Sequence, residues 1–69
     1  MKDNLFLIEM GRKIKEARKA KKISYSQFSK LTGIDMSNLW FIENGRRNVH
    51  ILTLKSIADV LCIDVKNFI

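Results

Sequence analysis

The sequence predicts an all-α fold, with one domain over residues 1–69 made of five short helices around a shared core. Apolar residues recur at the three- and four-residue spacing of amphipathic helices, rather than alternating as in half-buried strands. The chain contains no proline, so no helix is interrupted by one. Glycine, serine and aspartate stand where helices are expected to begin or end, and no linker or low-complexity tract separates them.

The first helix is expected at residues 4–21, with Asp3 as its N-cap. Its buried face is a stripe of apolar residues, namely Leu7, Met10, Ile14 and Ala17. Its other face carries the cations Arg12, Lys13, Lys15, Lys19, Lys21 and Lys22. We interpret Lys13, Lys15 and Lys19 as solvated charges that contribute a long-range field rather than contacts.

The second helix is expected to begin after Ser24, whose hydroxyl can cap it, and to turn Phe28 and Leu31 inward. Gly33 ends it, because glycine can adopt the positive φ that turns the chain out of a helix. The small side chain of Ser29 allows another helix to approach closely.

The third helix is expected at residues 36–44, between the N-cap Asp35 and the stop signal Gly45. Its inward side carries Leu39 and Ile42, because these residues lie three apart on one helical face.

The fourth helix is expected at residues 51–61, with His50 at its N-cap position. Its buried face consists of Ile51, Leu54, Ile57, Ala58 and Leu61. Asp64 is expected to cap a short fifth helix that runs through Phe68.

The stretch from residue 24 to residue 47 carries the strongest functional signal. Two short helices flank Gly33, and the basic pair Arg46 and Arg47 follows the second of them. This spacing is typical of a helix-turn-helix, whose second helix usually enters the major groove of DNA. A net charge of +6 agrees, because it indicates a polyanionic partner, nucleic acid rather than a membrane surface.

Other functional classes find no support in the sequence. The single cysteine, Cys62, cannot form an internal disulfide, and no cluster has the spacing of metal ligands. No motif links His50 to a nucleophile or a carboxylate, so we expect neither an enzyme nor a cofactor or small-molecule ligand. Residues 2–10 hold too few consecutive apolar residues for a signal peptide or a membrane span, which predicts a cytoplasmic protein.

Most of the chain, residues 11–68, resembles the lambda-repressor and Cro-like regulators, also called the xenobiotic-response-element family. The matching runs are GRKIKEARKAKKIS, QFSKLTGIDMSNLWFIENGRRN and LTLKSIADVLCIDVKNF. The GRRN segment, followed by an IA-x-x-L helix, looks like the controller proteins of restriction-modification systems. Phage and conjugative-element repressors share the same elements.

The resemblance implies an internal ion pair between Arg18 and Glu43. A guanidinium fork matches a carboxylate, and such a pair would tie the first helix to the third. The alternative role for Arg18 is a phosphate contact.

The resemblance also places base-reading side chains on the exposed side of the third helix, at Asp35, Met36, Ser37, Trp40 and Phe41. Family members commonly use Gln, Arg, Ser, Thr or Asn there, and only Ser37 fits that pattern. Three interpretations compete. Met36 and an aromatic residue could contact thymine methyl groups, the apolar face could bind another protein, or Trp40 could fold down over the core.

Phosphate contacts are expected from five residues on the resemblance, Tyr25, Asn44, Arg46, Arg47 and Asn48. Tyr25 occupies the first turn of the second helix, where the family usually places a phosphate-binding glutamine. The loop after the third helix grips phosphate in the family through side chains and backbone N–H groups. The alternative for Arg46 and Arg47 is a solvated surface pair.

Apolar residues beyond a four-helix core are candidates for a dimer contact, namely Leu52, Cys62, Ile63, Val65, Phe68 and Ile69, with Leu5, Phe6 and Ile8 at the other end. Ile63 and Phe68 could equally close the monomer core. The family usually places glycine at the position of Cys62, which predicts either backbone strain or an adjusted helix end there, rather than a reactive thiol.

These features together predict a sequence-specific transcriptional regulator that acts as a homodimer on a palindromic operator. The alternative is a helix-turn-helix-derived interaction module, or an antitoxin-like protein, that binds a protein through its Trp40 and Phe41 face.

Overall fold

Four α-helices and one turn of 3-10 helix make up the fold: α1 (Lys2–Ala20), α2 (Tyr25–Thr32), α3 (Met36–Glu43), α4 (Ile51–Leu61) and η1 (Val65–Asn67). The computed structural model describes residues 2–69, with side chains from residue 4 onward. The all-α prediction is confirmed, and residues 2–69 contain no strand. The predicted fifth helix is only the single turn η1, which is closed by the hydrogen bond from the Phe68 N–H to the Val65 carbonyl.

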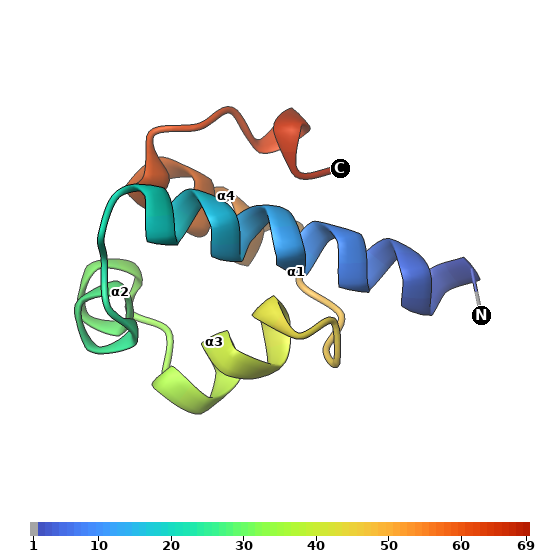
Figure 1. The fold of residues 1–69 in the computed structure, drawn as a ribbon, viewed down its shortest axis with the longest axis horizontal. Coiled ribbons are helices and arrows are strands. Elements are labelled where there is room, and N and C mark those ends of the chain that lie inside the picture. Colours follow the sequence, from blue (N-terminus) through green and yellow to red (C-terminus); the bar gives the residue numbers. More distant parts are fainter. Residues whose placement is uncertain (1) are drawn as a thin grey trace.

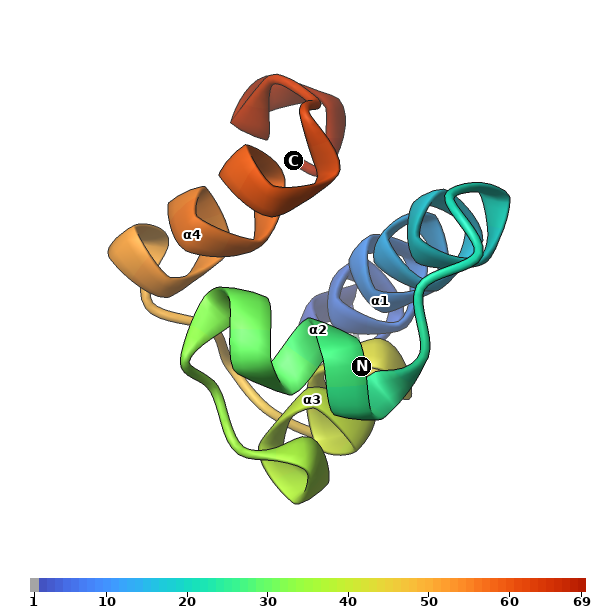
Figure 2. The same cartoon turned by 90° about the vertical axis from the view of Figure 1, so that its left-hand side faces the viewer.

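The long helix α1 packs against α3 and α4, while α2 packs against α3 and α4 and η1 packs against α4. In Figure 1, α3 and α4 lie on either side of α1, and α2 lies near the C-terminal end of α1. The first turns of α1 extend beyond the other elements. Figure 2 shows α2 between α3 and α4, both of which it contacts. Among residues 2–69, no helix combines the length and the apolarity needed to cross a membrane.

One core holds the elements together. Its buried residues are Met10, Ile14, Phe28, Leu39, Ile42, Leu54, Ile57, Ala58, Leu61 and Phe68. Two inward assignments were wrong, because Leu31 and Ile51 are 61% and 60% exposed. Leu31 lies in the last turn of α2, where Phe28 already fills the core, and Ile51 is the first residue of α4, a turn before Leu54 reaches the core.

Local capping fixes where α2 begins and ends. The Ser24 hydroxyl accepts a hydrogen bond from the Gln27 N–H at 3.1 Å, and the Gln27 side chain accepts one from the Ser24 N–H. This reciprocal capping box satisfies two donors that the helix leaves unpaired. Gly33 ends the helix in the left-handed region, at φ 76°, as expected.

Of the other predicted N-cap residues, only some make a capping hydrogen bond through the side chain. Asp64 caps η1 through its carboxylate, which accepts from the Lys66 N–H. Asp35 and His50 stand at the predicted N-cap positions of α3 and α4, but neither side chain makes a capping hydrogen bond. The Asp3 prediction was wrong in position, because α1 already begins at Lys2, and the side chain of Asp3 lies outside the described residues.

Two helices end at non-glycine residues with left-handed backbone. Cys62 ends α4 at φ 57°, which agrees with the strain predicted there. Lys22 also has φ 57°, and the N–H of Ile23 bonds back to the carbonyl of Arg18, so α1 ends at Ala20 rather than at residue 21. Such a conformation costs of order 1 kcal/mol or more for each side-chain-bearing residue.

The contact between α1 and α3 depends on Gly11, which sequence analysis did not single out. A Cβ atom at Gly11 would lie 2.5 Å from the carbonyl oxygen of Ile42 and 2.6 Å from that of Glu43. A Cβ at Gly45 would lie 2.6 Å from the Cα of Ile8. The C-terminal end of α3 is therefore held directly against the backbone of α1.

Candidate nucleic-acid interface

The inner side of α3 carries a buried ion pair with α1. The Arg18 Nε donates to Glu43 Oε2 at 2.7 Å, and Arg18 Nη2 donates to Glu43 Oε1 at 3.1 Å. Arg18 also donates through Nη1 to the Ile23 carbonyl at 2.7 Å, and the two charged residues are only 6% and 4% exposed. The pair inferred from the family resemblance is therefore present, and Arg18 is not available to a phosphate.

Tyr25 belongs to the same buried network. Its hydroxyl donates to Glu43 Oε1 at 2.8 Å, and the guanidinium carbon of Arg18 lies 4.2 Å from the centroid of its ring. Burial raises the pKa of the Tyr25 hydroxyl, and the hydrogen bond to Glu43 raises it further. The hydrogen bond to Glu43 also raises the pKa of Arg18.

This network corrects the role expected of Tyr25. A phosphate accepts hydrogen bonds, and the one proton of the Tyr25 hydroxyl is directed to Glu43 instead. In this structure Tyr25 fixes the first turn of α2 to α3 rather than facing a phosphate. The phenol is long enough for its hydroxyl to reach Glu43, the last residue of α3.

The outer side of α3 is apolar and open to solvent. Met36 and Trp40 are 50% and 46% exposed, and Ser37 and Asp35 are exposed as well. Leu39 and Ile42 are buried on the opposite side, as predicted. The exposure of Trp40 contradicts the interpretation in which its ring folds down over the core.

Phe41 is half-buried rather than fully exposed. The Trp40 ring meets it edge-on, with ring centroids 5.3 Å apart and an interplanar angle of 84°. The guanidinium carbon of Arg47 lies 4.7 Å from its centroid. Arg47 also donates through Nη1 to Asn38 Oδ1 at 3.0 Å, so this arginine folds back onto α3.

Sequence analysis missed Asn38 as a member of this surface. It lies three residues before Phe41, which makes the two residues neighbours on one helical face. That spacing was the available signal, but the Arg47 contact comes from the loop and no local pattern reveals it.

The loop after α3 places its polar residues around the end of the helix. The Asn44 side chain donates to the Trp40 carbonyl at 2.8 Å, and the Arg46 N–H donates to the Phe41 carbonyl at 2.8 Å. The side chains of Arg46 and Asn48 are exposed. Asn44 thus caps α3, while Arg46 and Asn48 face solvent beside it.

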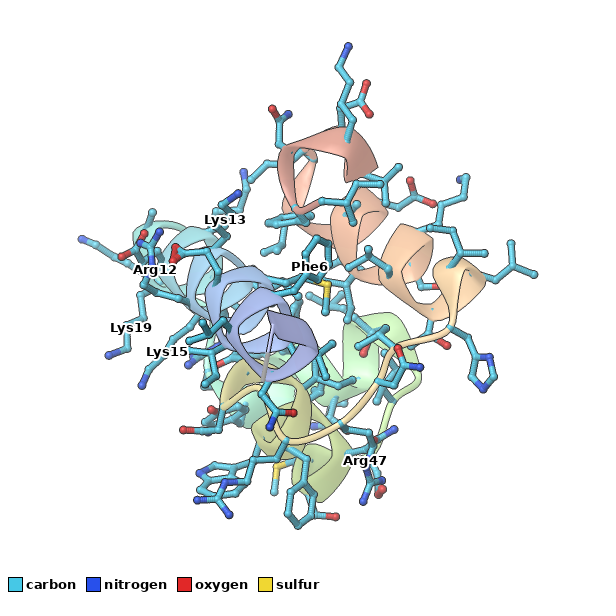
Figure 3. The ribbon with its side chains drawn as sticks, turned by 90° about the vertical axis from the view of Figure 1, so that its right-hand side faces the viewer. Phe6, Arg12, Lys13, Lys15, Lys19 and Arg47 are labelled. Carbon is cyan, nitrogen blue, oxygen red and sulfur yellow. The ribbon has the colours of Figure 1, made fainter. Side chains whose placement is uncertain are left out.

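Several exposed acidic residues are paired with basic residues on the same helix. Arg12 lies between Glu9 and Glu16, and Lys55 donates to Asp59 at 2.9 Å. Figure 3 shows Lys15 and Lys19 projecting from α1, and Arg47 near the loop that follows α3. Arg12, Glu9 and Glu16 together carry a net charge of −1, so Arg12 adds nothing to the long-range field expected of Lys13, Lys15 and Lys19.

The candidate dimer residues fall into two groups. Leu52 and Ile69 are 75% and 57% exposed, and Cys62 is exposed as well. Ile63 and Val65 pack partly against the core, and Phe68 is buried there. The dimer assignment of Phe68 was wrong, because its ring closes the monomer core. At the other end, Leu5, Phe6 and Ile8 are exposed.

Comparisons with known proteins agree with this architecture. The sequence model of a helix-turn-helix family, HTH_3, matches residues 14–65. The restriction-modification controller protein C.AhdI from Aeromonas hydrophila is 30% identical with a TM-score of 0.87, over 91% of this chain and 96% of that one. SinR, a master regulator for biofilm formation solved in complex with DNA, is 33% identical with a TM-score of 0.80, over 86% of this chain and 95% of that one.

A third structure is a larger protein that contains the same fold. An HTH_3 family transcriptional regulator from Vibrio cholerae is 30% identical with a TM-score of 0.88, over 96% of this chain but only 37% of that one. The comparison with curated protein sequences gave no match. The resemblance drawn from the sequence is confirmed, and the chain belongs to the HTH_3 helix-turn-helix family.

Proposed function

We propose that this protein is a DNA-binding transcriptional regulator that inserts α3 into the major groove. The observation that carries the proposal is the division of α3 into two faces. Its inner face is fixed by the buried Arg18–Glu43 pair, while its outer face, with Met36 and Trp40, stays open beside a basic loop. A rigid helix with an open face is what groove insertion requires. The likeness to C.AhdI and to SinR, which was solved with DNA, supports the same function.

Base reading would rest on apolar contacts more than on hydrogen bonds. Met36, Trp40 and Phe41 would contact thymine methyl groups, and Ser37 would supply a hydroxyl. Asp35 at the start of α3 would accept from a cytosine amine. The exposure of Met36 and Trp40 supports this assignment.

Phosphate contacts would come from the loop after α3. Arg46 and Asn48 expose their side chains beside the C-terminal end of that helix. Asn44 and Arg47 each donate one hydrogen bond within the protein, to the Trp40 carbonyl and to Asn38 respectively. Their remaining N–H groups would supply the phosphate contacts.

The protein would act as a homodimer on a palindromic operator. Two copies of the helix, about 34 Å apart, read two half-sites one turn of DNA apart. Leu52, Cys62 and Ile69 are exposed and remain candidates for the contact, together with the half-buried Ile63 and Val65. Sedimentation of the wild type and of a Leu52→Glu variant tests this contact, because a charge there should shift a dimer to monomer.

Selection of bound sequences from a pool of random duplexes tests the proposal directly. We expect one enriched palindrome, with half-site centres about 10 bp apart. Recovery of no preferred sequence by a folded protein would contradict the proposal.

The second candidate function is an interaction module that binds a protein through Met36, Trp40 and Phe41. The exposed apolar surface of Met36 and Trp40 favours it, because large apolar patches often mark protein contacts. In that case Trp40 fluorescence would respond to a protein partner and not to duplex DNA.

A further inference from the structure

We infer that Arg47 is a positioning residue of the recognition face, and that Asn38, which it holds, is a further specificity-determining residue that donates to a guanine. The inference rests on the proposed DNA-binding function. Neither role follows from the expectation that Arg47 is simply a phosphate contact.

The geometry places Arg47 across two neighbours on α3. Its guanidinium carbon lies 4.7 Å from the centre of the Phe41 ring, and its Nη1 donates to Asn38 Oδ1 at 3.0 Å. One planar group therefore stacks on an aromatic ring and bonds to an amide at the same time, which limits the motion of both side chains.

The direction of the Asn38 amide follows from the chemistry of its partner. Arginine has only donors, so the end of the amide that faces Arg47 must be the carbonyl oxygen. The Asn38 NH₂ group is then the end left for another partner. Arg47 thus decides which half of the amide is presented.

A free NH₂ group selects among base edges. An asparagine with both ends available pairs with adenine, which offers a donor and an acceptor in the major groove. When the oxygen is turned toward Arg47, the NH₂ donors face the base edge, and guanine is the base that offers two acceptors there, N7 and O6. The assigned partner of Asn38 is therefore a G·C pair in each half-site.

Arg46 is the matched control for Arg47. The two arginines are adjacent, carry the same charge and are both exposed, but the ring stack and the bond to Asn38 belong to Arg47. A purely electrostatic role would make them equivalent. A positioning role would make them differ in sequence discrimination.

The test compares Arg47→Lys, Arg46→Lys and Asn38→Ala with the wild type on the selected operator and on a set carrying one changed base pair per half-site. Lysine keeps the positive charge but has no planar fork to stack on Phe41 while bonding to Asn38. We expect Arg47→Lys and Asn38→Ala each to lose about 5- to 10-fold discrimination at the same G·C pair, the lower end of what a base contact provides. Arg46→Lys should keep its discrimination at that pair, because a phosphate contact carries no sequence information. Any loss of affinity in Arg46→Lys should be equal for the operator and for random duplex.

The double variant Asn38→Ala with Arg47→Lys sharpens the result. If Arg47 acts through Asn38, the double variant should discriminate no worse at that pair than Asn38→Ala alone. Equal discrimination by Arg47→Lys and Arg46→Lys, with a selective wild type, would overturn this inference and leave the proposed function standing. A wild type that selects no sequence would overturn both. Circular dichroism should show that all variants melt close to the wild type.

Discussion

Arg18 and Arg47 make the same two kinds of contact on opposite faces of α3: each lies over an aromatic ring and donates a hydrogen bond to a side chain of α3. Arg18 lies 4.2 Å from the Tyr25 ring centre and donates to Glu43, while Arg47 lies 4.7 Å from the Phe41 ring centre and donates to Asn38. The two sites differ in burial and in the charge of the acceptor. Arg18 is 6% exposed and faces a carboxylate, whereas Arg47 is exposed and faces a neutral amide.

Because of this difference in burial and charge, the two arginines contribute differently to the stability of the fold. A charge removed from water is costly unless its partner is present, so the buried site ties α1, α2 and α3 into one unit. An exposed contact of the same shape contributes little to stability, because water competes for both partners. The role expected of the Arg47 contact is therefore to orient Asn38 on the surface of α3, rather than to hold the fold together.

The largest expected effect is on the buried site. Arg18→Ala should lower the free energy of unfolding by about 3–5 kcal/mol, because it leaves the Glu43 carboxylate buried without its cation. Urea denaturation followed by circular dichroism measures the change. An unchanged free energy of unfolding would show that the ion pair does not hold the fold.

A smaller effect is expected where the apolar face meets DNA. Replacing thymine with uracil at contacted positions removes the methyl group and should weaken wild-type binding by at most about 1–3 kcal/mol per base pair. Phe41→Ala should lose this sensitivity while keeping its salt-dependent affinity for random duplex. Trp40 fluorescence should change on adding operator DNA. If wild-type affinity is the same for thymine and uracil duplexes, the methyl contacts are absent.

The Tyr25 hydroxyl should make stability depend on alkaline pH. Its pKa is raised in the folded protein, so its contribution is fully present below the ordinary tyrosine pKa of about 10 and is lost as pH rises through the higher folded value. As the chain has one tyrosine, absorbance of tyrosinate reports this group alone. We expect a midpoint above about 10 in the folded protein, and a midpoint at or below that value would contradict the hydrogen bond to Glu43.

Tyr25→Phe provides the matched variant. It removes the hydroxyl but keeps the ring under Arg18, and should cost about 1.5 kcal/mol of stability at neutral pH, the worth of a hydrogen bond to a charged group. The alkaline loss attributed to this group should then disappear.

The smallest expected effect is on the loop. Arg46→Ala should weaken binding about equally for operator and random duplex, and reduce the slope of log affinity against log salt by roughly one unit, because one phosphate contact releases about one counterion. Affinity measured across a salt series checks this. The same slope in the folded variant and the wild type would mean that Arg46 is only solvated.

The sequence predicted the features that depend on nearby residues. The helix positions, the Ser24 cap and the left-handed Gly33 follow from local pattern, and the Arg18–Glu43 pair followed from the family resemblance. Leu31 was misplaced, because periodicity does not say where along a short helix the core ends.

The missed features depend on residues brought together only by folding. Gly11 matters because α3 crosses α1 at that residue, and Tyr25 bonds to Glu43, a residue 18 positions away. The Arg47–Asn38 bond spans 9 positions between a loop and a helix. No spacing rule within one helix anticipates such contacts.

The two arginines can be tested side by side, by measuring the free energy of unfolding and the affinity for the selected operator in Arg18→Ala and Arg47→Ala. We predict that Arg18→Ala loses stability but keeps its affinity per folded molecule and its salt slope. We predict that Arg47→Ala stays within about 0.5 kcal/mol of wild-type stability, as exposed substitutions do, and loses operator affinity. The opposite pattern, with Arg18→Ala stable but unable to bind and Arg47→Ala unstable but binding normally, would contradict the division of α3 into a structural face and a DNA-reading face.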